Sequence, residues 1–206
     1  MEERPAGGNS NTSQKNTKSE QTLSTSLDEM MTLFRNIFKD DETLRIRVFS
    51  TMFTDSLRFG LVYVDGMVDK HLIQEGIIKP VMAFDFTKKN CDNKAELMEN
   101  IRTQVISISD VVASEDFDEM IYSIIAGKTL LLIDGFAGVL NIGAQGWETK
   151  ALAEPVTEKS VKGPREGFTE SLLVNLTLIR RRVQDSELKF VFSSLGTRSK
   201  TPICIC

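Results

Sequence analysis

A helical pattern of apolar residues begins just after residue 25 and predicts an amphipathic helix. Ser26 and Glu29 form a capping-box pattern at its start. The apolar residues that follow recur three or four positions apart, which places them on one helical face: Leu27, Met30, Met31, Phe34, Ile37 and Phe38. The next stretch, "LRIRVFS" from residue 44, alternates apolar residues with arginines and predicts a half-buried strand with a charged outer face.

Two later apolar stretches each end in Asp-Gly and predict further strands. "RFGLVYVDG" ends at Asp65-Gly66, and "TLLLIDG" ends at Asp134-Gly135. Asp-Gly is a common tight-turn signal, and "AGVLNIG" after the second turn has the pattern of its hairpin partner. The segments 94–105 and 115–126 predict two helices between these strands. Apolar residues from 68 to 81 predict a further helix, bent or ended near Pro80.

The last third of the chain repeats the order of helix and strands. A buried helical stripe is predicted by Leu172, Leu176, Ile179 and Val183. The stretches "LKFVFSSLG" and "TPICIC" then predict two strands. Because "LRIRVFS" and "LKFVFSS" open alike and each is followed by another apolar strand, the pattern indicates a duplicated unit.

These patterns give the fold class and the domain boundaries. We expect an α/β (α+β) protein made of two related α/β subdomains. Residues 1–25 have almost no apolar side chains and predict a disordered tail. The first subdomain is predicted at 26–150, a connector at 151–164, and the start of a second subdomain at 165–206. Because the second unit stops inside an apolar strand, we expect it to be incomplete in this chain.

Charge is unevenly distributed along the sequence. The net charge is −4, but the residues from Lys159 onward contain nine Lys and Arg against four Asp and Glu. This excess predicts a basic surface, centred on Arg180, Arg181 and Arg182, for an anionic membrane surface or an acidic partner. Solvated charge on two separate surfaces is the alternative. We expect no nucleic-acid partner.

Little in the sequence favours catalysis. Asp65 and Asp134 are candidate carboxylates at strand ends, but the tight-turn interpretation explains both without chemistry. Three cysteines and the single histidine, His71, do not form a structural zinc set. We therefore predict no enzyme activity, no metal and no cofactor.

The block "GPREGF" precedes the last predicted helix and is the densest candidate interaction site. A flexible glycine, a proline that fixes φ and acidic residues near a helix start all have structural explanations. They do not account for Arg165, for which a fixed ion pair or interface contact and a solvated loop position both stay open. The candidate residues of this block are Gly163, Pro164, Arg165, Glu166, Gly167 and Phe168.

The same block carries a resemblance to a known family. "GPREGFTESLLVNLTLIRRRV", with "LVYVDGMVDK", "LLLIDG", "GWE" and "SKTPICIC", resembles the A subunit of the GerA family of spore germinant receptors from about Ser26 onward. The resemblance implies a large N-terminal cytosolic domain of two α/β subdomains, followed by a membrane domain that this chain lacks. It also implies that this fragment is soluble, whereas the full-length protein sits in the inner membrane of the spore.

Function follows from the resemblance as an expectation. Receptors of this family assemble A, B and C subunits, sense nutrients such as amino acids or sugars, and trigger germination. The nutrient pocket is usually placed on the B subunit, so the A-subunit domain is expected to serve receptor assembly and signal relay. The alternative is a module that binds a small nutrient in the cleft between its two subdomains.

Overall fold

A computed structural model describes residues 23–88, 94–146 and 167–206 of the chain. Its largest element is a five-stranded antiparallel sheet with the strand order β1-β2-β4-β5-β3. The strands are β1 (Leu44–Ser50), β2 (Arg58–Val64), β3 (Val111–Ser114), β4 (Thr129–Ile133) and β5 (Val139–Ile142). β1 and β2 pair over their whole lengths, from Leu44 opposite Val64 to Ser50 opposite Arg58.

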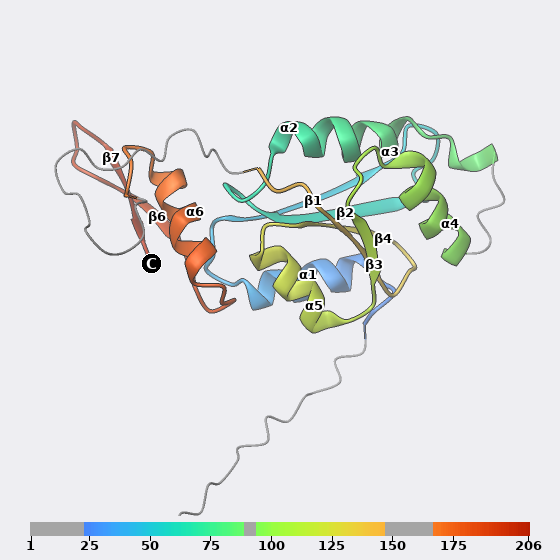
Figure 1. Cartoon of the computed structure of the whole chain (residues 1–206), viewed down its shortest axis with the longest axis horizontal. Helices are drawn as coiled ribbons and strands as arrows, with labels where there is room; N and C mark the ends of the chain where they lie inside the picture. The colour runs from blue at the N-terminus through green and yellow to red at the C-terminus, as the bar shows by residue number, and fades with distance from the viewer. Residues whose placement is uncertain (1–22, 89–93, 147–166) are drawn as a thin grey trace, which may run out of the picture.

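Helices cover both faces of this sheet (Figure 1). One face carries α1 (Leu27–Ile37) and α5 (Phe117–Ile125), which share a hydrophobic core with alternate residues of β2 and β4. The other face carries α2 (Lys70–Ile73), η1 (Gln74–Ile78), α3 (Lys79–Ala83), η2 (Phe86–Lys88), α4 (Lys94–Asn100) and η3 (Ile101–Val105). A second hydrophobic core lies on that side. Because side chains alternate along each strand, both faces of the central strands are apolar and buried.

The close approach of α1 to the sheet depends on a glycine. A Cβ at Gly60 would lie 2.6 Å from Met31 Cε and 2.7 Å from Leu27 Cδ1. The helix also begins as its sequence predicts, since the Ser26 side chain accepts a hydrogen bond from the Glu29 backbone N–H. Local capping and close packing therefore fix the position of α1 together.

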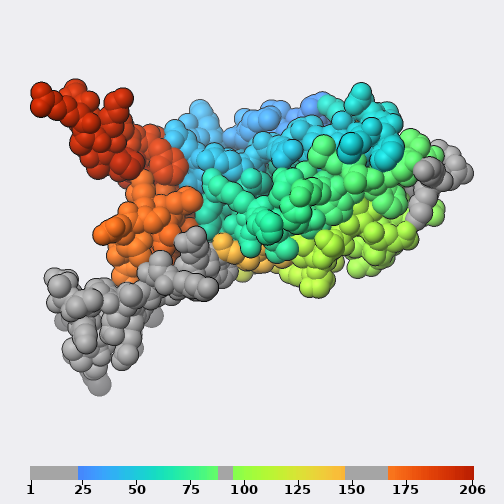
Figure 2. Space-filling view, turned by 90° about the horizontal axis from the view of Figure 1, so that it is seen from above, coloured from blue at the N-terminus to red at the C-terminus, as the bar shows by residue number. Residues whose placement is uncertain are grey.

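The last described segment forms a smaller unit beside the sheet. It consists of α6 (Leu172–Arg182) and a two-stranded antiparallel sheet of β6 (Val191–Leu195) and β7 (Thr201–Ile205). In the space-filling view these residues form a narrower lobe at one end of the main body (Figure 2). Whether this lobe begins a second copy of the first unit, and where the domain boundaries fall, stay predictions.

Most of the predicted elements are confirmed, with three differences. The stripe predicted for α6 is wrong in part, because Leu176 is buried but Val183 is 46% exposed, and Arg180 is buried instead. The helix expected to bend or end near Pro80 continues to Ala83, after widening into the π-helical turn η1 just before the proline. The short edge strand β3 was not predicted, because four residues with Val111 and Val112 at the start give too little alternation. The Asp-Gly turns are confirmed by Gly66 and Gly135, which both have positive φ.

Asp134, directly after β4, links the start of α1 to the ends of the neighbouring strands β2 and β4. Its carboxylate accepts hydrogen bonds from the Leu27 backbone N–H (3.1 Å) and from Arg58 (2.7 Å), and Arg58 also pairs with Asp28. Burial raises the pKa of Asp134, but these hydrogen bonds and the Arg58 charge outweigh it, so the pKa lies below its ordinary value. The group thus contributes stability that is present above its unfolded-state pKa and lost as the pH falls through its folded-state pKa.

We predict that Asp134→Ala lowers the free energy of unfolding by about 1–2 kcal/mol at neutral pH, because Leu27 and Arg58 lose a charged acceptor. Urea unfolding at pH 7 and at pH 3 measures the effect. The difference from the parent protein should shrink at the lower pH. Asp28→Ala removes an exposed partner of the same arginine and should cost less than about 0.5 kcal/mol; an equal cost for both variants would contradict the assignment.

Candidate functional site

The smaller lobe is joined to the sheet by a buried ion pair. The Arg180 side chain of α6 is 1% exposed, and its Nη2 lies 2.5 Å from Oδ2 of Asp41, which is fully buried. The same nitrogen donates to the Leu188 carbonyl at 3.2 Å. The guanidinium also stacks over the Phe190 ring, 4.7 Å from its centroid. Arg180 and Asp41 are 139 positions apart in sequence, so their ion pair is a tertiary contact that holds the two units together.

The turn between α1 and β1 holds Asp41 in place. Its Oδ1 accepts hydrogen bonds from the backbone N–H and the hydroxyl of Thr43, which leaves Oδ2 for Arg180. Asp40 just before it has a positive φ of 65°, which turns the chain sharply after the helix. Burial lowers the pKa of the Arg180 guanidinium from its ordinary value, while the Asp41 charge acts in the opposite direction.

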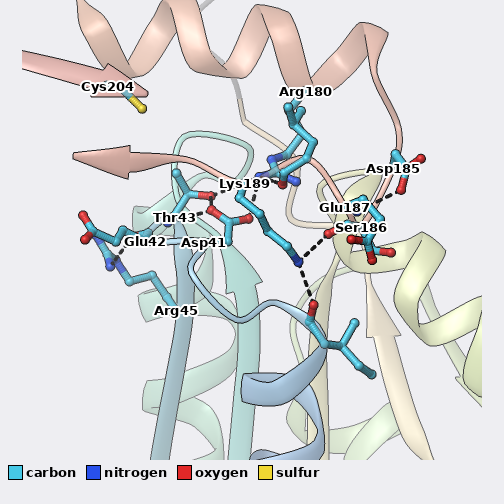
Figure 3. A network of polar contacts seen from close by, with 12 residues as sticks. Asp41, Glu42, Thr43, Arg45, Arg180, Asp185, Ser186, Glu187, Lys189 and Cys204 are labelled. Atoms are coloured by element: carbon cyan, nitrogen blue, oxygen red, sulfur yellow. Dashed lines mark hydrogen bonds and ion pairs between the residues drawn. The ribbon is translucent and has the colours of Figure 1, made fainter. Parts of the chain in front are cut away.

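Further polar contacts surround this pair (Figure 3). Nζ of Lys189 donates to the Ile37 carbonyl at the end of α1, at 2.7 Å. The Glu42 backbone N–H donates to the Phe190 carbonyl at 2.9 Å, and its carboxylate accepts from the Phe192 N–H at 3.0 Å. The turn at residues 37–43 therefore holds the start of β6 by its backbone and side chains alike.

A cavity of about 220 Å³ opens at the same junction, beside α6. One wall is the turn after β2, where a Cβ at Gly66 would meet Thr177 Oγ1 at 2.6 Å. The other wall is α6. The lining residues are Asp65, Gly66, Val68, Lys70, Gly146, Ser171, Leu173, Val174, Thr177, Leu178 and Arg181.

Comparisons with known proteins identify the family to which this chain belongs. Residues 32–206 match the model of the Bacillus/Clostridium GerA spore germination protein family. This chain belongs to the GerA family. It is 30% identical over 166 residues to the spore germination protein GerLA of Bacillus cereus, covering 81% of this chain and 32% of that protein. It is 33% identical over 145 residues to the uncharacterized membrane protein YfkQ of Bacillus subtilis, covering 70% and 27%.

A solved structure supports the same assignment. The crystal structure of the N-terminal domain of the A subunit of the Bacillus megaterium spore germinant receptor GerK3 matches with a TM-score of 0.66 and 25% identity. The match covers 89% of this chain and 64% of that domain. The GerA-family chain thus spans about a third of the GerLA length and about two thirds of the GerK3 domain.

The two candidate carboxylates lie far apart in this GerA-family fold. Asp65 follows the end of β2, while Asp134 pairs with Arg58 at the start of the same strand. Seven strand residues separate these positions, which is roughly 20 Å at the usual rise per residue. Asp65 instead forms ion pairs with Lys70 (2.7 Å) and Arg45 (3.3 Å). The geometry does not support a paired-carboxylate site.

The predicted basic surface needs a correction at Arg180. This residue is buried at the junction, where Asp41 neutralises its charge and the planar guanidinium stacks on the Phe190 ring. Arg181 is half-buried at the cavity and Arg182 is exposed. Adjacent helical residues point about 100° apart, so a run of three arginines cannot all face solvent beside a packed helix. The sequence analysis missed Asp41 as the partner of Arg180, because no pattern among the residues near Asp41 indicates a contact with a residue 139 positions away.

The "GPREGF" block lies largely outside the described residues. Of its six members, only Gly167 and Phe168 are described; Gly167 is half-buried and Phe168 is 71% exposed. The role predicted for Gly163, Pro164, Arg165 and Glu166 stays a prediction. Within the described ranges, no cluster of three His, Cys, Asp or Glu side chains could hold a metal ion. Over the same residues, no helix has the length and apolar character needed to span a bilayer.

We predict that Arg180→Ala destabilises the chain by about 3–5 kcal/mol, because it leaves Asp41 buried without its partner. Chemical denaturation followed by circular dichroism measures this loss. Arg182→Ala, an exposed neighbour of the same type, is the matched control and should change stability by less than about 0.5 kcal/mol. The double variant Asp41→Leu with Arg180→Met should recover much of the loss. Equal small effects of Arg180→Ala and Arg182→Ala would show that the pair does not lock the junction.

Proposed function

We propose that this chain is the N-terminal region of the A subunit of a nutrient germinant receptor, and that it serves receptor assembly and signal relay during spore germination. The observation that carries this proposal is the match to the A-subunit domain of the GerK3 receptor over 89% of the chain. Its partners are then the B and C subunits of the same receptor. The full-length protein sits in the inner membrane of the spore, with this region on the cytosolic side.

A relay role fits the construction of the junction better than a catalytic one does. The polar residues at the junction are engaged with one another across two structural units, as in Arg180 with Asp41 and Glu42 with Phe192. Such contacts transmit a change in the position of one unit to the other, since a buried pair cannot slide without losing its partner. The separation of Asp65 and Asp134 supports the absence of a carboxylate-based reaction.

The loop between β1 and β2 offers a surface for a receptor subunit. Met52 is 76% exposed and Phe53 is 52% exposed, and Val48 within β1 is 43% exposed. Neighbouring large apolar side chains on a protein surface commonly mark interaction sites. We propose that this loop contacts another subunit of the receptor.

The test uses spores that produce the full-length subunit. We expect the double variant Met52→Ser with Phe53→Ser to reduce co-purification of the B and C subunits about tenfold, because both anchors become polar. Thermal unfolding of the 206-residue chain should be nearly unchanged. Tyr122→Ser removes a 58% exposed aromatic on α5 and is the control for general surface effects. Full co-purification of the double variant would rule out this loop as the contact.

A basic surface toward an anionic membrane is a further part of the proposal. After the removal of Arg180 from this surface, exposed basic residues remain in the last segment at Arg182, Arg198 and Lys200. We predict that Arg182→Glu with Arg198→Glu weakens binding of the chain to phosphatidylglycerol vesicles more than Lys39→Glu with Arg47→Glu does. Raising the salt concentration should weaken binding of the parent chain. Equal effects of the two double variants in a vesicle co-sedimentation assay would contradict a membrane-facing surface and favour the alternative, in which these charges are only solvated.

A second candidate function is favoured by the junction cavity. Its volume of about 220 Å³ lies between the two structural units, where the alternative of a small-molecule module places a ligand. Ligand pockets occur preferentially at such boundaries. We therefore propose small-molecule binding at this cavity as a second role of the same region.

A further inference from the structure

The strand β1 forms one edge of the five-stranded sheet, and its outer side has no strand partner among the described residues. It is seven residues long, whereas β3 at the opposite edge has four. An edge strand presents a row of unpaired backbone N–H and C=O groups and is a template for pairing with another chain. β1 is therefore the longer of the two edges at which this sheet can be extended.

The hydrogen-bond pattern shows which residues of β1 are available for such pairing. The Asp65 N–H donates to the Thr43 carbonyl at 2.8 Å, which continues the register of β1 with β2 by one residue. Residues along an antiparallel strand alternate between bonding to the neighbouring strand and facing away from it. The odd-numbered residues of β1 therefore bond to β2, while Ile46 and Val48 direct their backbone groups outward. The described part of the chain offers no partner to these two backbones on that side.

An apolar groove lies along the same edge, between the end of α1 and β1. Its volume is about 370 Å³, and its lining includes Phe38, Leu44 and Ile46. Because side chains alternate along a strand, Val48 lies on the same face of β1 as Leu44 and Ile46, and it is 43% exposed. A strand placed beside β1 would direct every second side chain toward this apolar surface.

The rim of the groove is basic. Arg35 and Lys39 line it from the end of α1, and both are exposed. Neither forms an ion pair within the described ranges. Of the two acidic lining residues, Asp41 is neutralised by Arg180, which leaves only Asp40 against the two cations. The unbalanced positive charge favours an acidic partner.

The opposite face of β1 carries a further basic group. Arg47 is exposed, and its guanidinium lies 5.8 Å from the centre of the Phe49 ring. It has no acidic partner in the described part of the chain, whereas Arg45 pairs with Asp65. A strand beside β1 would place a side chain directly across from Arg47. Opposite charges stabilise such cross-strand pairs, and like charges destabilise them.

The same arginines disfavour pairing between two copies of this chain. Two antiparallel β1 strands paired about Ile46 would place Arg45 of each copy opposite Arg47 of the other. Like charges directly opposite one another are destabilising, and charged side chains are a common protection of edge strands against self-association. The edge therefore selects against a second copy and in favour of an acidic segment.

We propose that the outer edge of β1 pairs with an extended, acidic segment of a partner protein. The segment adds a sixth strand to the five-stranded sheet. Its backbone bonds to Ile46 and Val48, its apolar side chains pack into the groove, and its acidic side chains face Arg47 and the basic rim. In this mode the main-chain hydrogen bonds provide affinity, and the alternating side chains provide specificity. The proposal does not depend on the β1–β2 loop contact or on the junction cavity.

The experiment measures binding of labelled, capped peptides to the 206-residue chain by fluorescence anisotropy at low salt. The first probe alternates glutamate and valine, the second alternates lysine and valine, and the third is the glutamate peptide with its consecutive central amides N-methylated. We expect only the first to bind, because the second has the wrong charge and the third cannot pair as a strand. Hydrogen exchange measured by NMR should slow at the Ile46 and Val48 amides when the first peptide is bound.

Two variants separate the backbone contribution from the charge contribution. Val48→Pro removes an outward N–H, which an edge strand tolerates, and should weaken binding about tenfold or more. Val48→Ala keeps this N–H and should weaken binding less. Arg47→Glu should weaken binding of the glutamate peptide and allow the lysine peptide to bind. Arg198→Glu, the same charge change at an exposed residue between β6 and β7, should leave both results nearly unchanged.

Each remaining outcome overturns the proposal. Failure of the glutamate peptide to bind, or equal binding by the parent and Val48→Pro, would show that the edge is not a pairing site. Binding without slower exchange at Ile46 and Val48 would show a charge contact elsewhere. A dimer in sedimentation velocity that Val48→Pro abolishes would show that a second copy occupies the edge. Thermal unfolding checks that each variant is folded, and Arg47→Glu decides the question if the proline variant is not.

Discussion

The arrangement of this region depends on one buried ion pair, Arg180 with Asp41. Desolvating a guanidinium and a carboxylate is costly, and this cost is offset only in a geometry that brings the two charges into contact. Thr43 supplies two hydrogen-bond partners to Asp41, and the Leu188 carbonyl supplies one to Arg180. An apolar contact between the same two units would tolerate small rotations, whereas this pair specifies a single docking of α6 against the sheet.

The sheet explains why the candidate carboxylates have structural rather than chemical roles. Neighbouring antiparallel strands run in opposite directions and therefore end at opposite ends of the sheet. The Asp-Gly turns after β2 and β4 consequently cannot meet. Each aspartate instead stabilises the end of the sheet at which it lies. Asp134 holds the start of α1 through Leu27 and Arg58, and Asp65 holds the turn that forms one wall of the junction cavity. The two ends of the strands therefore have different roles: one holds the start of α1, and the other faces the smaller lobe.

The sequence predicted those parts of the fold whose cause is local. The stripe of α1, the alternation of β1 and the Asp-Gly turns depend on neighbours within a few residues, and each was found. The junction could not be found in this way. Arg180 stands in a run of three arginines at a helix end, where local electrostatics favours any cation, and its partner lies 139 positions away. Only the packing of α6 decides which of the three arginines faces inward.

The ion pair and the cavity occupy the same short helix, and this proximity gives the region a physical route for relay. Arg180 is fixed to the turn before β1, while its neighbour Arg181 and the first turn of α6 line the cavity. A change at the cavity that moves α6 along or about its axis must therefore strain the Arg180–Asp41 contact. Because that contact tolerates little displacement, movement of α6 at the cavity is coupled to the turn before β1. Under the proposed relay role, this one contact is the point at which a change on one side of the domain would reach the other.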